Sequence, residues 1–325
     1  MDVLAQIRKP IEAELESFAS LFDITLQHRN PLLETALRHV LGRKGKMMRP
    51  ILLFLSAKKF GSVSNQALHA AVSLEMLHTA SLVHDDVVDE SEERRGQKSV
   101  NALLDNKAAV LVGDYMLSTA LKHAAMTDNI RVVELISWLG QALSDGELQQ
   151  LVNLQSEEIS EDQYFDVIRK KTASLFAVSA QIGAMLSGAS DEDIEKARLF
   201  GEYIGVCFQI RDDIFDYYAD QHEVGKPTGN DMKEGKLTLP VIYAVLRSDS
   251  DEWKQLAYKV RSRTATDDEI ARLVCFTKES GGIEYAREKM EQIRSVAFQL
   301  VSTSGNEEVN ESLRLYFDFV LKRVS

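Results

Sequence analysis

The chain has 325 residues, of which 45% are apolar and 27% are charged, and this is enough to bury a large globular core. Only five prolines and 17 glycines are present, so long helices are favoured over a turn-rich all-β fold. The formal charge of -12 argues against a general nucleic-acid binder, but it leaves room for anionic substrates held by metal ions or local basic clusters.

The beginning of the chain shows no secretory pattern, because Arg8 and Lys9 follow the first residues without an apolar stretch. The longest uninterrupted apolar runs, such as residues 51–55, are far too short to cross a membrane. We therefore expect a cytoplasmic protein with no integral membrane segment. Cys207 and Cys275 lie in apolar helical patterns, so a disulfide framework is not expected.

Apolar residues recur at helical spacing along the chain, with short polar breaks between the helical patterns. Two capping boxes are expected at helix starts, Ser160 with Gln163 and Thr266 with Glu269. Irregular stretches are expected at about 90–99 and about 220–236, and both are candidate functional loops. These patterns predict one all-α domain over residues 1–325, with roughly ten or more helices.

Two copies of the pattern D-D-x-x-D end long apolar helical patterns. The first aspartate cluster is Asp85, Asp86 and Asp89, and the second aspartate cluster is Asp212, Asp213 and Asp216. Residues four apart share a helix face, so the carboxylates repel one another near a helix C-terminus, where negative charge is unfavourable. Solvated acidic faces are the alternative, but only about 0.1 chance copies of the pattern are expected in a chain of this length. Such oxygen ligands suit magnesium, which also binds substrate phosphates.

Basic residues stand close to both clusters. They are Lys46, Arg49, Arg94, Arg95, Lys171, Lys226 and Lys236. Any one of them alone would be an ordinary surface cation, but their repeated placement beside carboxylates indicates a site for phosphate groups. His78 shares a helix face with Asp85, and Gln209 shares one with Asp212.

Together these residues resemble the all-trans polyprenyl diphosphate synthase family, and most closely its long-chain octaprenyl members. The resemblance covers nearly the whole chain. The motifs that carry it are Gly45-Lys46-x-x-Arg49-Pro50, residues 78–89, Arg94-Arg95-Gly96, Lys171-Thr172, Gln209-x-x-Asp212-Asp213-x-x-Asp216, Gly225-Lys226, Asp231 and Gly235-Lys236-x-Thr238-Leu239-Pro240. One departure is Lys44, where the family often has a glycine. The resemblance implies a single-domain helical bundle with a central cavity, and a homodimer.

The resemblance also implies a reaction, the head-to-tail (1'-4) condensation of isopentenyl diphosphate onto an allylic diphosphate such as farnesyl diphosphate. The implied catalytic residues are Asp85, Asp86, Asp89, Lys171, Thr172, Gln209 and Asp212. Three magnesium ions would be bound directly by Asp85, Asp89 and Asp212, with support from Asp86, Asp213 and Asp216. The allylic diphosphate would be held by Arg94, Lys171, Lys226 and Lys236, and isopentenyl diphosphate by Lys46, Arg49, His78 and Arg95. Thr172 and Gln209 would lie beside the reacting carbons.

Product length should depend on the helix that precedes the first aspartate cluster. The residues expected to line the route of the growing chain are Leu74, Leu77, Ala80 and Ser81. Ser81 lies about 6 Å and Leu77 about 12 Å below Asp85 by helical rise. Short-chain members of the family carry bulky aromatic residues at positions 80 and 81, so the small residues here predict a long product. The resemblance of residues 71–101 to octaprenyl and related long-chain synthases implies about C40, for quinone side chains, with C30 to C50 left open. Gly201 on the second helix indicates either extra cavity space or close helix packing.

Other functions remain open. A geranylgeranyl diphosphate synthase would keep the reaction but stop at C20, and a non-catalytic subunit of a heteromeric synthase would keep the fold. A class I terpene cyclase would carry a different second metal motif, and a head-to-head synthase would lack the isopentenyl site. A metal-stabilised helical scaffold would not need the phosphate-binding cations. One assay of chain elongation separates all of these.

Overall fold

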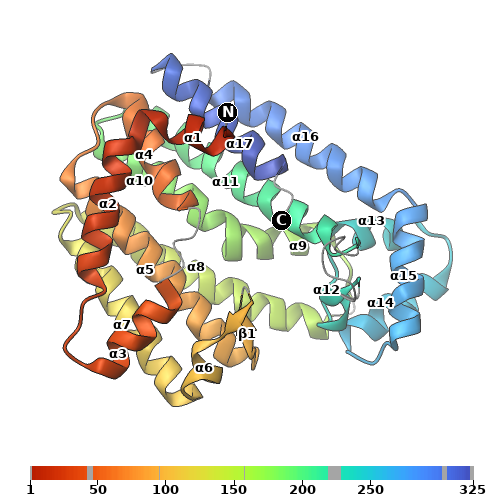
Figure 1. Ribbon diagram of the computed structural model, residues 1–325. Helices are drawn as coiled ribbons and strands as arrows, with labels where there is room; N and C mark the ends of the chain where they lie inside the picture. The colour runs from red at the N-terminus through yellow and green to blue at the C-terminus, as the bar shows by residue number, and fades with distance from the viewer. Residues whose placement is uncertain are drawn as a thin grey trace. The chain divides into compact units, whose positions relative to one another are not determined.

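The computed structural model describes residues 2–41, 47–94, 96–156, 158–218, 228–301 and 306–322. In these residues the regular structure is helical apart from one short antiparallel hairpin, which confirms the all-α prediction (Figure 1). The hairpin pairs β1 (Glu93–Arg94) with β2 (Gln97–Lys98). Within these ranges, no helix combines the length and apolar character that a membrane span requires.

The helices are given in chain order. The first half of the chain contains α1 (Val3–Arg8), the 3-10 helix η1 (Lys9–Ile11), α2 (Glu12–Thr25), α3 (Pro31–Leu41), α4 (Met48–Phe60), α5 (Asn65–Val88), α6 (Val100–Leu103), α7 (Asn106–Ala125), α8 (Ile130–Gln155) and α9 (Glu161–Ile168). The rest contains the π-helical segment η2 (Arg169–Ala173), α10 (Ser174–Leu186), α11 (Asp191–Phe215), α12 (Asn230–Lys233), α13 (Leu239–Arg247), α14 (Asp251–Arg261), α15 (Asp267–Glu279), α16 (Gly282–Val301) and α17 (Glu307–Lys322).

The contacts divide the chain into two compact units, each built from separate stretches. Unit 1 consists of Met1–Gln141, Leu175–Gly201 and Leu300–Tyr316. Unit 2 consists of Ala142–Ser174, Glu202–Gln299 and Phe317–Ser325. The first aspartate cluster belongs to unit 1 and the second to unit 2. A single domain over 1–325 stays a prediction.

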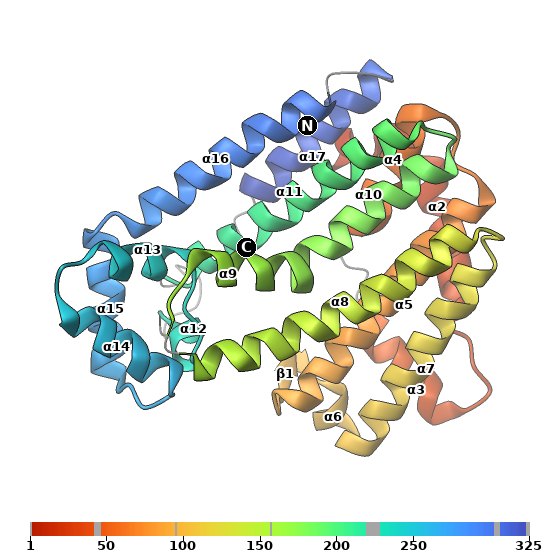
Figure 2. The ribbon, with the colours of Figure 1, turned by 180° about the vertical axis from the view of Figure 1, so that it is seen from behind.

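Unit 1 is built around α5, which lies side by side with α7 (Figures 1 and 2). The side chains of Ser64 and Asp105 cap the N-termini of these two helices by accepting backbone N–H groups. Ser73 joins the helices where they are buried, since its hydroxyl group donates to the Ala120 carbonyl oxygen at 2.7 Å. Because α5 packs along α7, the helix that ends in the first aspartate cluster is rigidly positioned within unit 1.

Unit 2 has its own apolar core, made by α9, the C-terminal part of α11, and α13 to α15. Figure 2 shows α13, α14 and α15 gathered together, and each pair of them is in contact. Ile210 and Ile214 bring α11 into this core one turn apart. The second aspartate cluster on the same stretch of α11 is thereby fixed against α9. Cys207, also on α11, is buried, whereas Cys275 is exposed, and both are free thiols.

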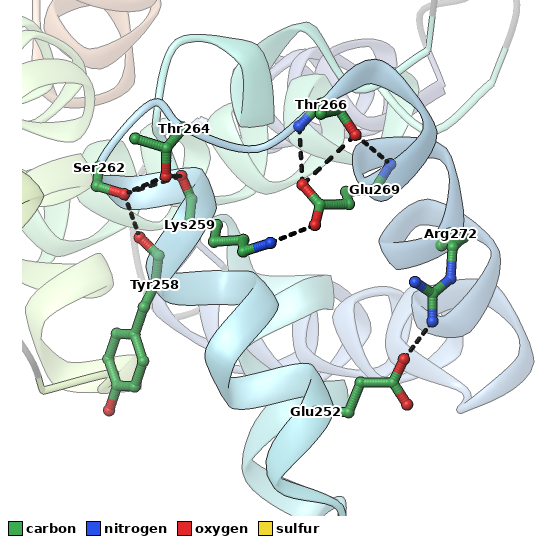
Figure 3. Close-up of polar contacts among 8 residues, drawn as sticks. All are labelled: Glu252, Tyr258, Lys259, Ser262, Thr264, Thr266, Glu269 and Arg272. Atoms are coloured by element: carbon green, nitrogen blue, oxygen red, sulfur yellow. Dashed lines mark hydrogen bonds and ion pairs between the residues drawn. The ribbon is translucent and has the colours of Figure 1, made fainter.

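The two predicted capping boxes have different outcomes. At the start of α15, Thr266 Oγ1 accepts the Glu269 N–H group while Glu269 Oε2 accepts the Thr266 N–H group, which confirms that box (Figure 3). The same Glu269 pairs with Lys259 of α14, so one carboxylate serves both the cap and the α14–α15 contact. Ser160 does cap α9, but the box prediction there is wrong, because the Gln163 amide turns to Glu158 instead.

Gly201 marks a close approach of α10 and α11 rather than extra cavity space. A Cβ atom at this position would lie 2.3 Å from the backbone oxygen of Phe176, which no real side chain tolerates. Of the two interpretations of Gly201, the structure therefore supports close helix packing.

Candidate active site

The first aspartate cluster occupies the last turn of α5. Asp89 is the C-cap residue, and its N–H group donates to the Asp85 carbonyl oxygen at 2.8 Å. Asp86 is only 3% exposed and accepts the Arg94 Nε–H group at 2.7 Å. Burial raises the pKa of Asp86, and the Arg94 guanidinium opposes that rise. Arg94 therefore lies beside the cluster, as predicted, with its charge paired to Asp86.

The hairpin that carries Arg94 replaces part of the irregular stretch predicted for residues 90–99. The Ser99 hydroxyl group donates to the Ser91 carbonyl oxygen at 2.6 Å. The Asn101 amide donates to the carbonyl oxygens of both Asp86 and Ser91. These bonds fix the hairpin to the end of α5, because residues that follow the hairpin, Ser99 and Asn101, both donate to the Ser91 carbonyl oxygen just before it. The irregular-loop prediction is therefore wrong for this part of the chain.

Arg49 and His78, the two described residues of the predicted isopentenyl site, are in direct contact. Arg49 Nη2 lies 2.7 Å from His78 Nε2, and Arg49 Nη1 lies 3.3 Å from Glu75 Oε1. A guanidinium group can only donate, so His78 accepts at Nε2 and carries its proton on Nδ1. Arg49 is thus held between an imidazole and a carboxylate on α5.

The second aspartate cluster takes part in a chain of side-chain hydrogen bonds. Asp213 is 4% exposed and accepts the Tyr164 hydroxyl group at 2.6 Å and the Gln209 amide at 2.8 Å. The other end of the Gln209 amide accepts the Thr172 hydroxyl group at 2.8 Å. Gln209, Thr172 and Asp213 are therefore brought together, as their predicted roles require.

The two other aspartates of this cluster have different partners. Asp212 Oδ1 accepts the Nε–H group of its neighbour Arg211 at 3.0 Å. The Asp216 carboxylate accepts the backbone N–H groups of Asn230 and Asp231 at 2.9 and 3.0 Å. Burial raises the pKa of Asp216, and the two backbone N–H groups oppose that rise. Asp216 thereby fixes the start of α12 against the end of α11.

Lys171 is anchored by α8. Its Nζ forms an ion pair with Glu147 and donates to Gln150 Oε1 at 3.1 Å. The approach of α8 to η2 is close, because a Cβ atom at Gly146 would lie 2.7 Å from Lys171 Cγ. The ammonium group therefore has a defined position beside Thr172, its neighbour in the chain.

Unit 2 contains a cavity of about 200 Å³. It is lined by most of the described site residues that were predicted in the part of the chain from Lys171 onward. Its polar lining includes Lys171, Thr172, Gln209, Asp213, Asp231 and Lys236. Burial raises the pKa of Asp213 strongly and that of Asp231 to about 6, and in both cases the repulsion of another carboxylate adds to the rise. A cation bound beside these groups would stabilise their ionised forms.

The donor set fits a hard divalent cation that keeps part of its shell for other ligands. Within the residues described, no three carboxylate, imidazole or thiol groups converge closely enough to hold a metal ion by themselves. Magnesium is usually bound by one or two carboxylates, with water and substrate phosphates completing an octahedron. Each aspartate cluster contains one buried carboxylate whose pKa is raised by burial, Asp86 in the first and Asp213 in the second, and the other carboxylates are more accessible to a cation.

The residues predicted to control product length lie on α5 inside unit 1. Leu74, Leu77 and Ala80 are almost completely buried, and Ser81 is half-buried. At the level of Leu77 the neighbouring helix is within ordinary contact distance, since a Cβ atom at Gly140 would lie 3.8 Å from Leu77 Cδ1. Leu77 and Gly140 therefore face each other across α5 and α8, below the two small residues.

Some predicted residues cannot be placed, and some relevant ones were not predicted. The predicted substrate ligands outside the described residues are Lys46, Arg95 and Lys226. Sequence reasoning missed Glu75 and Tyr164 and gave Asp231 no role. Glu75 had a usable signal, because it is the single carboxylate in the long apolar stretch before the first aspartate cluster. Tyr164 had none, since it lies 49 residues from the Asp213 that it binds.

Comparison with known proteins gives consistent matches along the chain. The sequence profile named polyprenyl synthetase matches residues 30–276. Heptaprenyl diphosphate synthase component 2 of Bacillus subtilis is 36% identical, over 96% of this chain and 87% of that relative. Octaprenyl diphosphate synthase of Haemophilus influenzae is 33% identical, over 83% of this chain and 82% of that relative. The crystal structure of geranylgeranyl pyrophosphate synthase from Bacteroides thetaiotaomicron is 49% identical, with a TM-score of 0.87, over 99% and 100% of the two chains.

Proposed function

Since the chain belongs to the polyprenyl synthetase family and is a trans-prenyltransferase, we propose that it condenses isopentenyl diphosphate head to tail onto an allylic diphosphate and releases a product of about C40. The observation that carries the proposal is the cavity in unit 2. It places the cations Lys171 and Lys236 beside buried carboxylates, with the uncharged Thr172 and Gln209 next to them. That combination suits a diphosphate at one end and a carbocation at the other.

The allylic diphosphate would be bound by Lys171 and Lys236, together with Arg94 and Lys226. In the reaction the allylic C–O bond breaks, and both of its electrons leave with pyrophosphate. The hydroxyl and carbonyl dipoles of Thr172 and Gln209 would stabilise the positive charge left on carbon without reacting with it. Arg49 and His78, with Lys46 and Arg95, would bind isopentenyl diphosphate, whose double bond attacks the cation. A proton is then lost from the new adduct, and the departing pyrophosphate is the proposed base.

Three magnesium ions are proposed, bound by Asp85, Asp89 and Asp212 with support from Asp86, Asp213 and Asp216. Bound magnesium would supply charge that stabilises the leaving pyrophosphate. The protein's own contribution is to present each cluster at the end of a long helix, α5 for the first and α11 for the second.

The proposed length of about C40 rests on the resemblance to long-chain synthases and on the small side chains of Ala80 and Ser81, where short-chain members of the family carry bulky aromatic residues. An all-trans product of this size would suit quinone side chains. Geranylgeranyl diphosphate, C20, is the second candidate, because the Bacteroides thetaiotaomicron protein that is 49% identical carries that activity in its name. In this case Leu77 and Gly140 would close the cavity one turn lower.

A homodimer in the cytoplasm is also proposed. Apolar side chains are exposed along α7 and the beginning of α8 in unit 1. They are Val110, Leu111, Leu121, Met126, Ile130 and Trp138, which we call the α7–α8 apolar face. A second copy of the chain would cover such a face. The alternative is a different partner chain, because the Bacillus subtilis relative is named as a component.

The test is elongation by the purified chain with magnesium, farnesyl diphosphate and labelled isopentenyl diphosphate. A ladder of dephosphorylated products ending near C40 would support the full proposal. A stop at C20 would keep the reaction and favour the geranylgeranyl alternative. Elongation that requires a second, different protein would replace the homodimer with a heteromeric enzyme.

A further inference from the structure

Tyr164 connects the core of unit 2 to the second aspartate cluster. It belongs to α9, its side chain is buried in the unit 2 core, and its hydroxyl group donates to Asp213 Oδ2 at 2.6 Å. A tyrosine hydroxyl group is protonated at neutral pH, so it can donate one hydrogen bond. One oxygen of the Asp213 carboxylate is therefore held by a group that no substrate-binding prediction includes.

The other oxygen of Asp213 is committed as well. Asp213 Oδ1 accepts the Gln209 Nε2–H group at 2.8 Å, and Gln209 Oε1 accepts the Thr172 hydroxyl group at 2.8 Å. Three consecutive hydrogen bonds thus run from α9 through α11 to η2. Thr172, Gln209 and Asp213 all line the cavity of unit 2.

This chain of hydrogen bonds fixes which end of the Gln209 amide faces which partner. The two ends of an amide have nearly the same size, so packing alone does not choose between them. In the structure the Gln209 NH2 group donates to Asp213 Oδ1, which selects this end of the amide for Asp213. Its carbonyl oxygen then points to the Thr172 side. Without the Tyr164 hydroxyl group, Asp213 Oδ2 would lose this donor, and the carboxylate would hold the Gln209 amide less rigidly.

We infer that Tyr164 is a positioning residue of the elongation reaction, which acts through Asp213 to hold the Gln209 carbonyl oxygen toward the reacting allylic carbon. The role in the reaction rests on the proposed function, whereas the hydrogen bonds do not. Fixed dipoles stabilise a developing charge better than mobile ones, because they need no reorganisation as the charge forms. The loss of Tyr164 should therefore lower kcat more than it changes substrate binding.

The kinetic test compares Tyr164→Phe with Tyr285→Phe, which removes a similar hydroxyl-to-carboxylate bond, to Glu161 Oε2 at 2.8 Å, elsewhere in unit 2. Tyr164→Phe is expected to lower kcat about 10- to 100-fold with both KM values within about twofold, and Tyr285→Phe to leave both parameters unchanged. Adding Tyr164→Phe to Gln209→Ala should cause no further loss, because both substitutions remove the same dipole. Losses that multiply in the double variant would overturn the inference.

A second measurement needs no substrate. With glutamine side chains labelled by 15N, the Gln209 amide signal is the one missing from Gln209→Ala. Its hydrogens should exchange slowly in the unmodified chain and in Tyr285→Phe, and rapidly in Tyr164→Phe. Thr172→Val, which cuts the chain at its other end, should keep the slow exchange, so the inference stays testable if Tyr164→Phe does not fold.

The outcomes separate the inference from the function on which it rests. Slow exchange in Tyr164→Phe, or rapid exchange in Thr172→Val, would show that Tyr164 does not hold Gln209. An unmodified chain that fails to elongate would refute the proposed function, and the reaction role of Tyr164 with it. An elongating chain whose kcat is insensitive to Tyr164→Phe would refute the inference alone.

Discussion

At the scale of single residues, Ser81 is the position where a side chain can be added to shorten the product. It is half-buried, about 6 Å below Asp85 by helical rise, and its hydroxyl group donates to the His78 carbonyl oxygen. Ser81→Phe should shift the longest product by several isoprene units, because the ring would block the space under the first aspartate cluster. Product chromatography measures the shift. Ser17→Phe is the control, since Ser17 is exposed on α2 and bonded to its own helix in the same way. An unchanged product ladder would place the growing chain elsewhere.

Glu75 gives a second test at this scale. Its carboxylate pairs with Arg49 and should orient the guanidinium group for isopentenyl diphosphate. Glu75→Gln should raise KM for isopentenyl diphosphate about 10- to 150-fold while kcat changes little, since a charged hydrogen bond contributes about 1.5–3 kcal/mol. The matched control is Glu14→Gln, because the Glu14 side chain is also 19% exposed and also forms an ion pair, with Lys58. Equal KM values for the two variants would mean that Glu75 only supports the fold.

At the scale of helices, the contact between α8 and η2 depends on the absence of a side chain at Gly146. A Cβ atom there would lie 2.7 Å from Lys171 Cγ and 2.8 Å from Lys170 Cβ. Gly146→Ala should displace η2 and raise KM for the allylic diphosphate, about tenfold if roughly 1.4 kcal/mol of binding is lost.

Gly140 on the same helix provides the control for Gly146. A Cβ atom at Gly140 meets only Leu77, at an ordinary contact distance of 3.8 Å. Gly140→Ala should therefore raise the melting temperature, because alanine stabilises a helix interior by about 0.5–1 kcal/mol relative to glycine. If both variants behaved alike in kinetics and in thermal melts, the close approach at Gly146 would not matter for the site.

The helices also show what the sequence could and could not predict. Both aspartate clusters were expected at helix ends, and α5 and α11 do end there, because the D-D-x-x-D spacing and the preceding apolar period are local signals. The hairpin β1–β2 was not predicted, since strands of two residues carry no periodicity. The Ser160 capping box failed because Glu158, in the preceding loop, competes for Gln163. The Tyr164–Asp213 contact depends on tertiary packing, which no single stretch of sequence encodes.

At the scale of the whole molecule, the α7–α8 apolar face predicts the oligomeric state. Leu111 is 60% exposed and Trp138 is 52% exposed, and together with the other exposed apolar side chains of this face they mark a surface that a partner would cover. Leu111→Glu combined with Trp138→Glu should halve the mass measured by light scattering, while helicity by circular dichroism is unchanged. Leu246→Glu, at 48% exposure on α13, is the control and should leave the mass unaltered. A single-chain mass for the unmodified protein would refute the homodimer.

The buried carboxylates of unit 2 predict how the stability of the metal-free protein depends on pH. Asp213 and Asp231 have pKa values raised by burial, that of Asp231 to about 6, whereas an unfolded chain keeps them near 3.8. The folded state thus binds more protons between these values, so the free energy of unfolding contributed by these groups falls as pH rises from about 4 to above 6.

With a chelator present, the melting temperature should therefore drop between pH 5 and pH 8 more in the unmodified chain than in Asp231→Asn, where this contribution is removed. Asp249→Asn is a surface control and should follow the unmodified chain. Magnesium with inorganic pyrophosphate should reverse the trend, because a cation favours the ionised carboxylates and competes with protons. A melting temperature that responds to pH identically in all three chains would mean that burial does not raise the pKa of Asp231 in the folded, metal-free protein.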